Sequence, residues 1–152
     1  MGLRMRITQF TDYSLRVLIY LGLKGEKATV TEISKSFRIS RNHLVKVVHA
    51  LSLRGYVNSF TGRNGGVELA LEPSKIIIGR LVEELEPMEL LECFNAATNT
   101  CPIRGVCQLE GSLVQARNAF LESLKTHTLA DFLTPGPSRS ERMRRLKIVR
   151  KV

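Results

Sequence analysis

The stretch that decides the fold is residues 29–71, TVTEISKSFRISRNHLVKVVHALSLRGYVNSFTGRNGGVELAL. It opens with a capping box, in which Thr29 and Glu32 satisfy each other's free backbone amides at the start of a helix. The apolar spacing predicts this helix over about 30–37 and, after a short turn, another helix over about 41–54.

The second half of the stretch has the pattern of a β-hairpin. Residues 56–60 and 67–71 are strand-like, and the segment 61–66 between them, TGRNGG, is rich in the residues that tight turns require. Pro73 closes the hairpin, because proline cannot continue the ladder.

Helical patterns flank this stretch on both sides. The spacing predicts helices over about 8–24, 77–86 and 105–126, and a short capped helix at 128–133. The expected fold class is therefore mainly α with a small β-hairpin: a winged helix-turn-helix domain plus a long helix.

The order helix, short helix, turn, capped helix and hairpin is typical of DNA-binding proteins. The helix over 41–54 has one apolar face, so its polar face is presented outward, where it can enter a major groove. The first two turns of that helix and the hairpin tip supply the candidate DNA contacts, which are Ser40, Arg41, Asn42, His43, Lys46, Arg63, Asn64, Gly65 and Gly66. Glycines permit close approach to a DNA backbone, and an arginine at the tip can reach a phosphate or a narrow minor groove.

The charge is distributed unevenly along the 152 residues. Residues 1–66 carry eleven Lys/Arg against three Asp/Glu (+8), residues 67–137 five against ten (−5), and residues 138–152 seven against one (+6), which gives the net +9. A basic N-terminal half beside an acidic middle indicates a polyanionic partner for the first part only.

All three cysteines, Cys93, Cys101 and Cys107, lie in one segment, CFNAATNTCPIRGVC. An odd number of thiols cannot all pair, and the spacing lacks the C-x2-4-C pairs of a structural zinc site. Three thiolates in one loop suit an iron–sulfur cluster with one non-cysteine ligand, while a three-ligand zinc site and a thiol redox switch remain open.

Other classes of protein receive little support from the sequence. No run of 18 apolar residues occurs, so we expect no membrane span, and the N-terminus lacks the apolar stretch of a secretory signal, which predicts a cytoplasmic protein. No catalytic motif is present near the cysteines, so we expect no enzyme.

The motifs FTDYSLRVLIYL, SRNHLVKVVHALSLRGYV, GRNGGVELAL, ELEP, the cysteine segment and HTLADFL follow one another in this order. In this order they resemble the nitric-oxide-sensing iron–sulfur repressors called NsrR, over about residues 5–134. These repressors belong to a superfamily of dimeric winged-helix regulators that also contains iron-responsive and cluster-assembly regulators.

The resemblance implies a ligand set. Cys93, Cys101 and Cys107 match the cluster cysteines, and Asp12 matches an aspartate that supplies the fourth ligand from the partner subunit. A carboxylate is a weak ligand for cluster iron, so that corner is the one open to a diatomic gas. Glu110 stands where the cluster-assembly regulator has a histidine ligand, so that ligand set is not reproduced. We expect a 4Fe-4S cluster in preference to 2Fe-2S.

The resemblance also implies a function. We expect a homodimeric repressor that binds a palindromic operator in double-stranded DNA and loses operator affinity when nitric oxide attacks the cluster. The expected domains are a DNA-binding domain over 1–76, a cluster loop and dimerisation helix over 77–134, and a flexible basic tail over 135–152. The alternatives are an iron- or redox-responsive regulator of the same superfamily, a zinc-stabilised DNA-binding protein, and a thiol or iron–sulfur redox enzyme.

Overall fold

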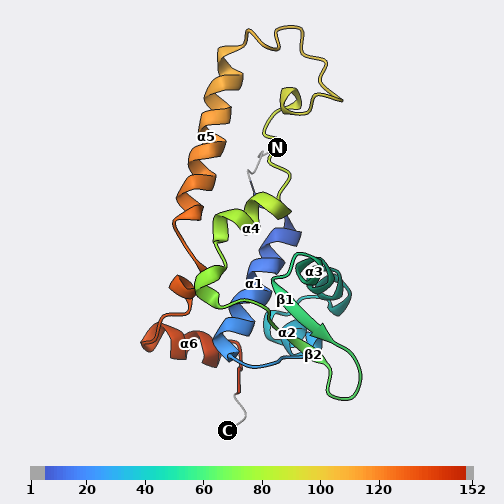
Figure 1. The fold of residues 1–152 in the computed structure, drawn as a ribbon, viewed down its shortest axis with the longest axis vertical. Coiled ribbons are helices and arrows are strands. Elements are labelled where there is room, and N and C mark those ends of the chain that lie inside the picture. The colour runs from blue at the N-terminus through green and yellow to red at the C-terminus, as the bar shows by residue number, and fades with distance from the viewer. Residues whose placement is uncertain (1–5, 150–152) are drawn as a thin grey trace. The chain divides into compact units, whose positions relative to one another are not determined.

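A computed structural model describes residues 6–149 of the chain (Figure 1). The elements, in chain order, are α1 (Gln9–Lys24), α2 (Val30–Phe37), α3 (Arg41–Leu53), β1 (Val57–Phe60), β2 (Gly66–Leu69), η1 (Pro73–Lys75), α4 (Ile78–Leu85), η2 (Glu92–Phe94), α5 (Gln108–Lys125), η3 (Leu129–Phe132) and α6 (Pro137–Arg145). They form two compact units. The winged-helix unit runs up to Ile76 and resumes at Thr128, and the loop–helix unit covers 77–127.

The core of the winged-helix unit is built by the first three helices. The apolar stripe expected on the third helix is confirmed: Leu44, Val47, Val48 and Leu51 are buried. They pack with buried side chains of the other two helices, chiefly Val17, Leu18, Leu21 and Ile33. The expected capping box of Thr29 and Glu32 is present and starts α2. Because the apolar face of α3 is used inward, its polar face is left to solvent.

The hairpin pairs β1 with β2 in antiparallel register, from Val57 opposite Leu69 to Phe60 opposite Gly66. Its turn depends on Gly65, because a Cβ there would lie 2.7 Å from the Phe60 carbonyl oxygen. Ala28, in the loop before α2, adds an antiparallel bridge to Val67, so the start of β2, next to the turn, is fixed to the winged-helix unit.

In the loop–helix unit, α4 packs against the C-terminal part of α5. Gly79 makes this crossing possible, because a Cβ at this position would meet the backbone nitrogen of Lys125 and lie 2.8 Å from the Leu121 carbonyl oxygen. The long helix begins at Gln108, later than the expected residue 105, since Gly105 has φ 81° and belongs to a turn.

Within the described residues, the basic tail expected over 135–152 contains a helix. Residues 137–145 form α6, and the segment from Thr128 onward belongs to the winged-helix unit. The helix forms because Pro137 starts it and Arg139 attaches it to α1, donating to the Leu23 carbonyl at 3.2 Å. A composition rich in arginine had suggested a solvated chain, but these tertiary contacts order it. Residues 150–152 lie outside the described part.

Candidate DNA-binding surface and cysteine loop

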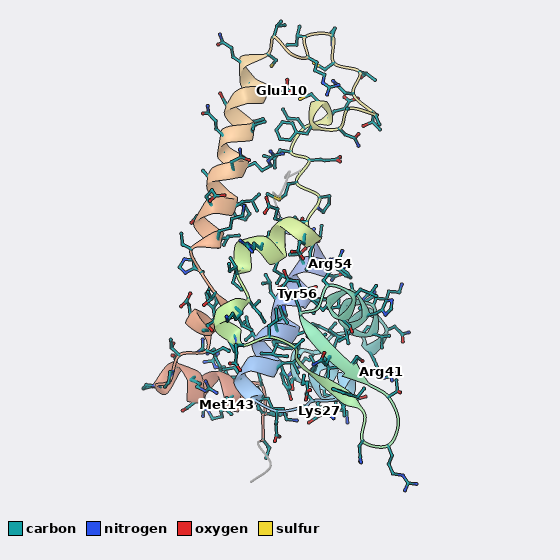
Figure 2. All side chains as sticks on the ribbon, viewed as in Figure 1. Lys27, Arg41, Arg54, Tyr56, Glu110 and Met143 are labelled. Atoms are coloured by element: carbon teal, nitrogen blue, oxygen red, sulfur yellow. The ribbon has the colours of Figure 1, made fainter. Side chains whose placement is uncertain are left out.

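The N-terminal half of α3 presents a polar surface. Arg41, Asn42, His43 and Lys46 are all exposed. Figure 2 shows Arg41 at the start of the helix and Arg54 beyond its other end. Ser40 is the N-cap residue, and its side chain makes no capping hydrogen bond with the helix. The expected contact residues of this helix thus share one solvent-facing surface.

His43 also contacts the protein itself: the centre of its ring lies 6.3 Å from the centre of the Tyr13 ring on α1. This contact ties the polar surface of α3 to the helix that carries Asp12. A structural role for His43 therefore coexists with the expected contact to DNA.

The hairpin tip holds the other candidate contacts. Arg63 and Asn64 are exposed, with Gly62 at φ 90° before them. A Cβ at Gly66 would lie 2.7 Å from Cγ of Lys27, so this glycine lets that lysine cross the hairpin. The Lys27 ammonium lies 4.2 Å from the centre of the Phe60 ring.

Sequence reasoning missed two residues of this surface. Val45 is 44% exposed in the middle of the polar face of α3, where an apolar side chain can contact a thymine methyl group. Lys27 is an exposed cation beside Phe60 and Gly66, the strand pair next to the turn of the hairpin. The helical spacing already places Val45 near Lys46 on the polar side of this helix, although not as a DNA contact, and nothing in the sequence links Lys27 to the hairpin.

Asp12, the expected fourth ligand, lies in the first turn of α1 and is half-buried. Both of its carboxylate oxygens accept hydrogen bonds from Arg16, at 3.0 Å and 2.7 Å. The hydrogen bond with Asp12 is the main cause that raises the pKa of Arg16. The Arg16 guanidinium also lies 5.8 Å from the ring centre of Phe37, at the end of α2. A metal ion would therefore have to compete with Arg16 for this carboxylate.

The three cysteines are half-buried free thiols in the loop–helix unit. Cys93 lies in η2, Cys101 in the loop, and Cys107 is the N-cap residue of α5. Asn99 Oδ1 accepts a 2.8 Å hydrogen bond from the Cys101 amide. Each thiol is thus held by a different local structure.

Further contacts shape the loop around these thiols. The Glu92 carboxylate accepts hydrogen bonds from both the amide and the hydroxyl of Thr100, which close the loop on itself. The Arg117 guanidinium of α5 lies 5.4 Å from the ring centre of Phe94, so η2 is attached to the long helix.

The pKa of Cys93 responds to its burial and to the charged groups around it. Desolvation raises the pKa of Cys93 above that of a free thiol, and the negative charges of Glu110, Cys101 and Cys107 raise it further. Glu110 lies in the first turn of α5 (Figure 2). A bound cation would favour the thiolate form of Cys93, which a metal ligand must adopt.

The thiols nevertheless do not form a closed metal site. Within residues 6–149, no three His, Cys, Asp or Glu side chains converge closely enough to hold a metal ion. The donor set fits a cluster in residue type, and the loop would have to contract for the three thiols to reach one cluster.

Also within residues 6–149, no helix combines the length and apolar character of a membrane span.

The sequence of the chain matches one family over nearly its whole length. Residues 7–135 match Rrf2, described as an iron-dependent transcriptional regulator. The HTH-type transcriptional regulator NsrR of Shouchella clausii is 45% identical over 132 residues, which cover 85% of this chain and 89% of the relative. NsrR of Bacillus subtilis is 42% identical, with 85% of this chain and 90% of the relative covered.

Solved structures agree with this assignment. CymR (YrzC), the global cysteine regulator of B. subtilis, superposes with a TM-score of 0.66 at 25% identity, covering 84% of this chain and 95% of that one. The mainly helical winged-helix fold and the resemblance to NsrR are therefore confirmed, and the chain is a regulator and not an enzyme. It belongs to the Rrf2 family of DNA-binding transcriptional regulators.

Proposed function

We propose that this chain is a homodimeric transcriptional repressor that senses nitric oxide through an iron–sulfur cluster. The observation that carries the proposal is the loop of three half-buried free cysteines leading into α5, in a chain 45% identical to an NsrR. A DNA-binding regulator acts in the compartment that holds the chromosome, so the proposed function implies a cytoplasmic location.

Cys93, Cys101 and Cys107 would hold the cluster, which we take to be 4Fe-4S in preference to 2Fe-2S. When bound, the cluster supplies iron that combines with nitric oxide. Asp12 of the partner subunit is the proposed fourth ligand. Its ion pair with Arg16 must open for this role, so Asp12 gains or loses Arg16 as the ligand position empties or fills. Iron content of Asp12→Ala tests the assignment.

The opening of that ion pair offers a link to the DNA-binding surface. Arg16 contacts Phe37 at the end of α2, and Tyr13 beside it contacts His43 on α3. When Asp12 changes its partner, the contacts of Arg16 with α2 and of Tyr13 with α3 would therefore change as well. Only such a difference between the DNA-bound and free states can alter operator affinity.

The dimer is proposed from the apolar face of α5. Leu109 is 59% exposed and Phe120 37%, and their spacing places them on one side of α5. Val106, in the turn just before α5, is 80% exposed. A second copy of the same face would cover this stripe and give a two-fold axis, which matches a palindromic operator. Sedimentation equilibrium should give twice the chain mass of 17.1 kDa.

The experiment for the proposed function measures operator affinity of the cluster-loaded protein before and after nitric oxide, at one salt concentration. We expect at least a tenfold loss, the range of about 1–3 kcal/mol typical of allosteric coupling. Equal affinities would contradict sensing of nitric oxide.

A second candidate is an iron-responsive regulator, favoured by the description of the matched family as iron-dependent. Depletion of iron from the medium, without nitric oxide, would then release the operator in cells. If iron depletion has no effect while nitric oxide does, the first proposal stands alone.

For the DNA-binding surface, Arg41→Ala is expected to weaken operator binding by about 1–3 kcal/mol, because an arginine at this point of a recognition helix contacts bases or phosphates. Arg54→Ala is the matched control at the other end of α3, where the side chain donates to the Ala50 carbonyl. Fluorescence anisotropy on an operator duplex measures both. Equal losses in the two variants would contradict the assignment of this surface.

A further inference from the structure

The C-terminal segment has no role in the function proposed above. The family match ends at residue 135, while α6 and the residues after it continue to 149. Residues 136–149 carry five Lys/Arg and one acidic residue, a net charge of +4. A basic helix appended to a DNA-binding unit raises the question of what it binds.

The start of α6 is attached to α1. The Arg139 guanidinium donates to the Leu133 carbonyl at 2.7 Å and to the Leu23 carbonyl at 3.2 Å. Leu23 lies in the last turn of α1, where helix carbonyls lack partners within the helix and attract cations. Figure 1 shows α6 beside this end of α1.

The end of α6 is attached to the helix-turn-helix itself. The Ser36 hydroxyl, in the last turn of α2, donates to the Leu146 carbonyl at 2.8 Å. Ile148, just beyond, is only 8% exposed, and its amide donates to the Met143 carbonyl, so a buried apolar side chain follows the end of α6. Ser36 precedes the first residue of α3 by five positions, which places the end of α6 next to the turn that leads into the recognition helix.

The cations at this end are available to a partner. Arg144 and Arg145 share Glu141, yet their side chains remain 77% and 78% exposed. One carboxylate cannot neutralise two guanidiniums, so a positive surplus faces solvent, and Lys147 is exposed as well. On the α2 side of the same junction, Lys35 and Arg38 are exposed.

We propose that the flank surface, formed by Arg144, Arg145 and Lys147 of the α6 end with Lys35 and Arg38 of α2, binds DNA phosphates outside the bases contacted by α3. Phosphate binding fits because the cations are exposed, lack a matching number of carboxylates, and are attached to the helix-turn-helix. Such contacts add affinity and fix register without reading sequence. The proposal rests on DNA binding by the winged-helix unit and not on the sensing of nitric oxide.

The test compares the full-length protein with Arg144→Gln/Arg145→Gln/Lys147→Gln on an operator duplex and on an unrelated duplex, across a salt series without nitric oxide. The variant keeps Arg139, Leu146 and Ile148, so the anchors of α6 remain. We expect the slope of log affinity against log salt to become shallower by about 1–3, since each lost phosphate contact removes about 0.9. Affinity for both duplexes should fall roughly tenfold at low salt, with unchanged base preference.

Glu141→Gln is the matched control of opposite sign, because it removes the only carboxylate of the segment and frees both arginines. It should bind both duplexes more tightly, with a slope at least as steep. Unchanged slopes and affinities in the triple variant, as an acidic protein partner would give, overturn the proposal. So does a change in base preference with an unchanged slope. A protein that binds DNA but ignores nitric oxide would refute the sensor and leave this test intact.

Discussion

Cys101→Ala is expected to lower the iron and sulfide bound per chain by at least about tenfold and to abolish the response of operator binding to nitric oxide. Loss of groups that merely orient metal ligands costs about 10–100-fold in metal affinity, and loss of a ligand itself costs more. Cys101 is the central thiol of the loop, and its amide is already fixed by Asn99. No other cysteine can replace it, because the remaining two are the other proposed ligands.

Thr98→Ala is the matched control in the same loop, since Thr98 is exposed and its side chain does not shape the turn. It should retain iron, sulfide and the response. The measurements are colorimetric iron and sulfide counts on anaerobically purified protein, followed by anisotropy on operator DNA. Full iron content in Cys101→Ala would refute the ligand assignment, and bound zinc without sulfide would favour a zinc-stabilised protein.

The elements of the winged-helix unit were predictable because their signals are local. The capping box at Thr29 fixes the start of α2 to the residue, and the apolar stripe of α3 identifies its buried face. The second capping box, at Thr128 and Asp131, starts η3 as expected, although the short helix is a 3-10 helix.

The C-terminal segment was not predictable, because its order comes from distant residues. The hydrogen bond of Ser36 to Leu146 joins residues 110 positions apart, and that of Arg139 to Leu23 joins residues 116 apart. A run of arginines has no periodic apolar pattern from which these two long-range hydrogen bonds could be predicted. Composition alone therefore indicated a flexible tail.

The cysteine loop was predictable only in part. The residue types and their clustering indicate metal chemistry, and the resemblance to NsrR selects the donors. Asp12 also has a partner within its own helix. Asp12 and Arg16 are four residues apart, a spacing that favours an ion pair, so this contact was predictable from the sequence.

Gly79→Ala is expected to destabilise the loop–helix unit by about 1–3 kcal/mol or more, because the added methyl group overpacks the crossing of α4 and α5. The atoms it would meet are the Lys125 backbone nitrogen and the Leu121 carbonyl oxygen, and backbone cannot rotate aside as a side chain can. Leu121 is the only buried residue of α5 in the described part of the chain, so the crossing at Gly79 is the main anchor of this helix. The gain of about 1 kcal/mol in helix propensity offsets only part of the cost.

Gly111→Ala is the matched control, because the same change on α5 meets no atom within 4 Å. It should raise stability by about 0.5–1 kcal/mol through helix propensity alone. Urea unfolding followed by circular dichroism compares the two variants with the wild type, and opposite shifts of the midpoint are expected. If Gly79→Ala were as stable as Gly111→Ala, the two helices could not cross at Gly79, and α5 would need another anchor to support the thiol at its N-terminus.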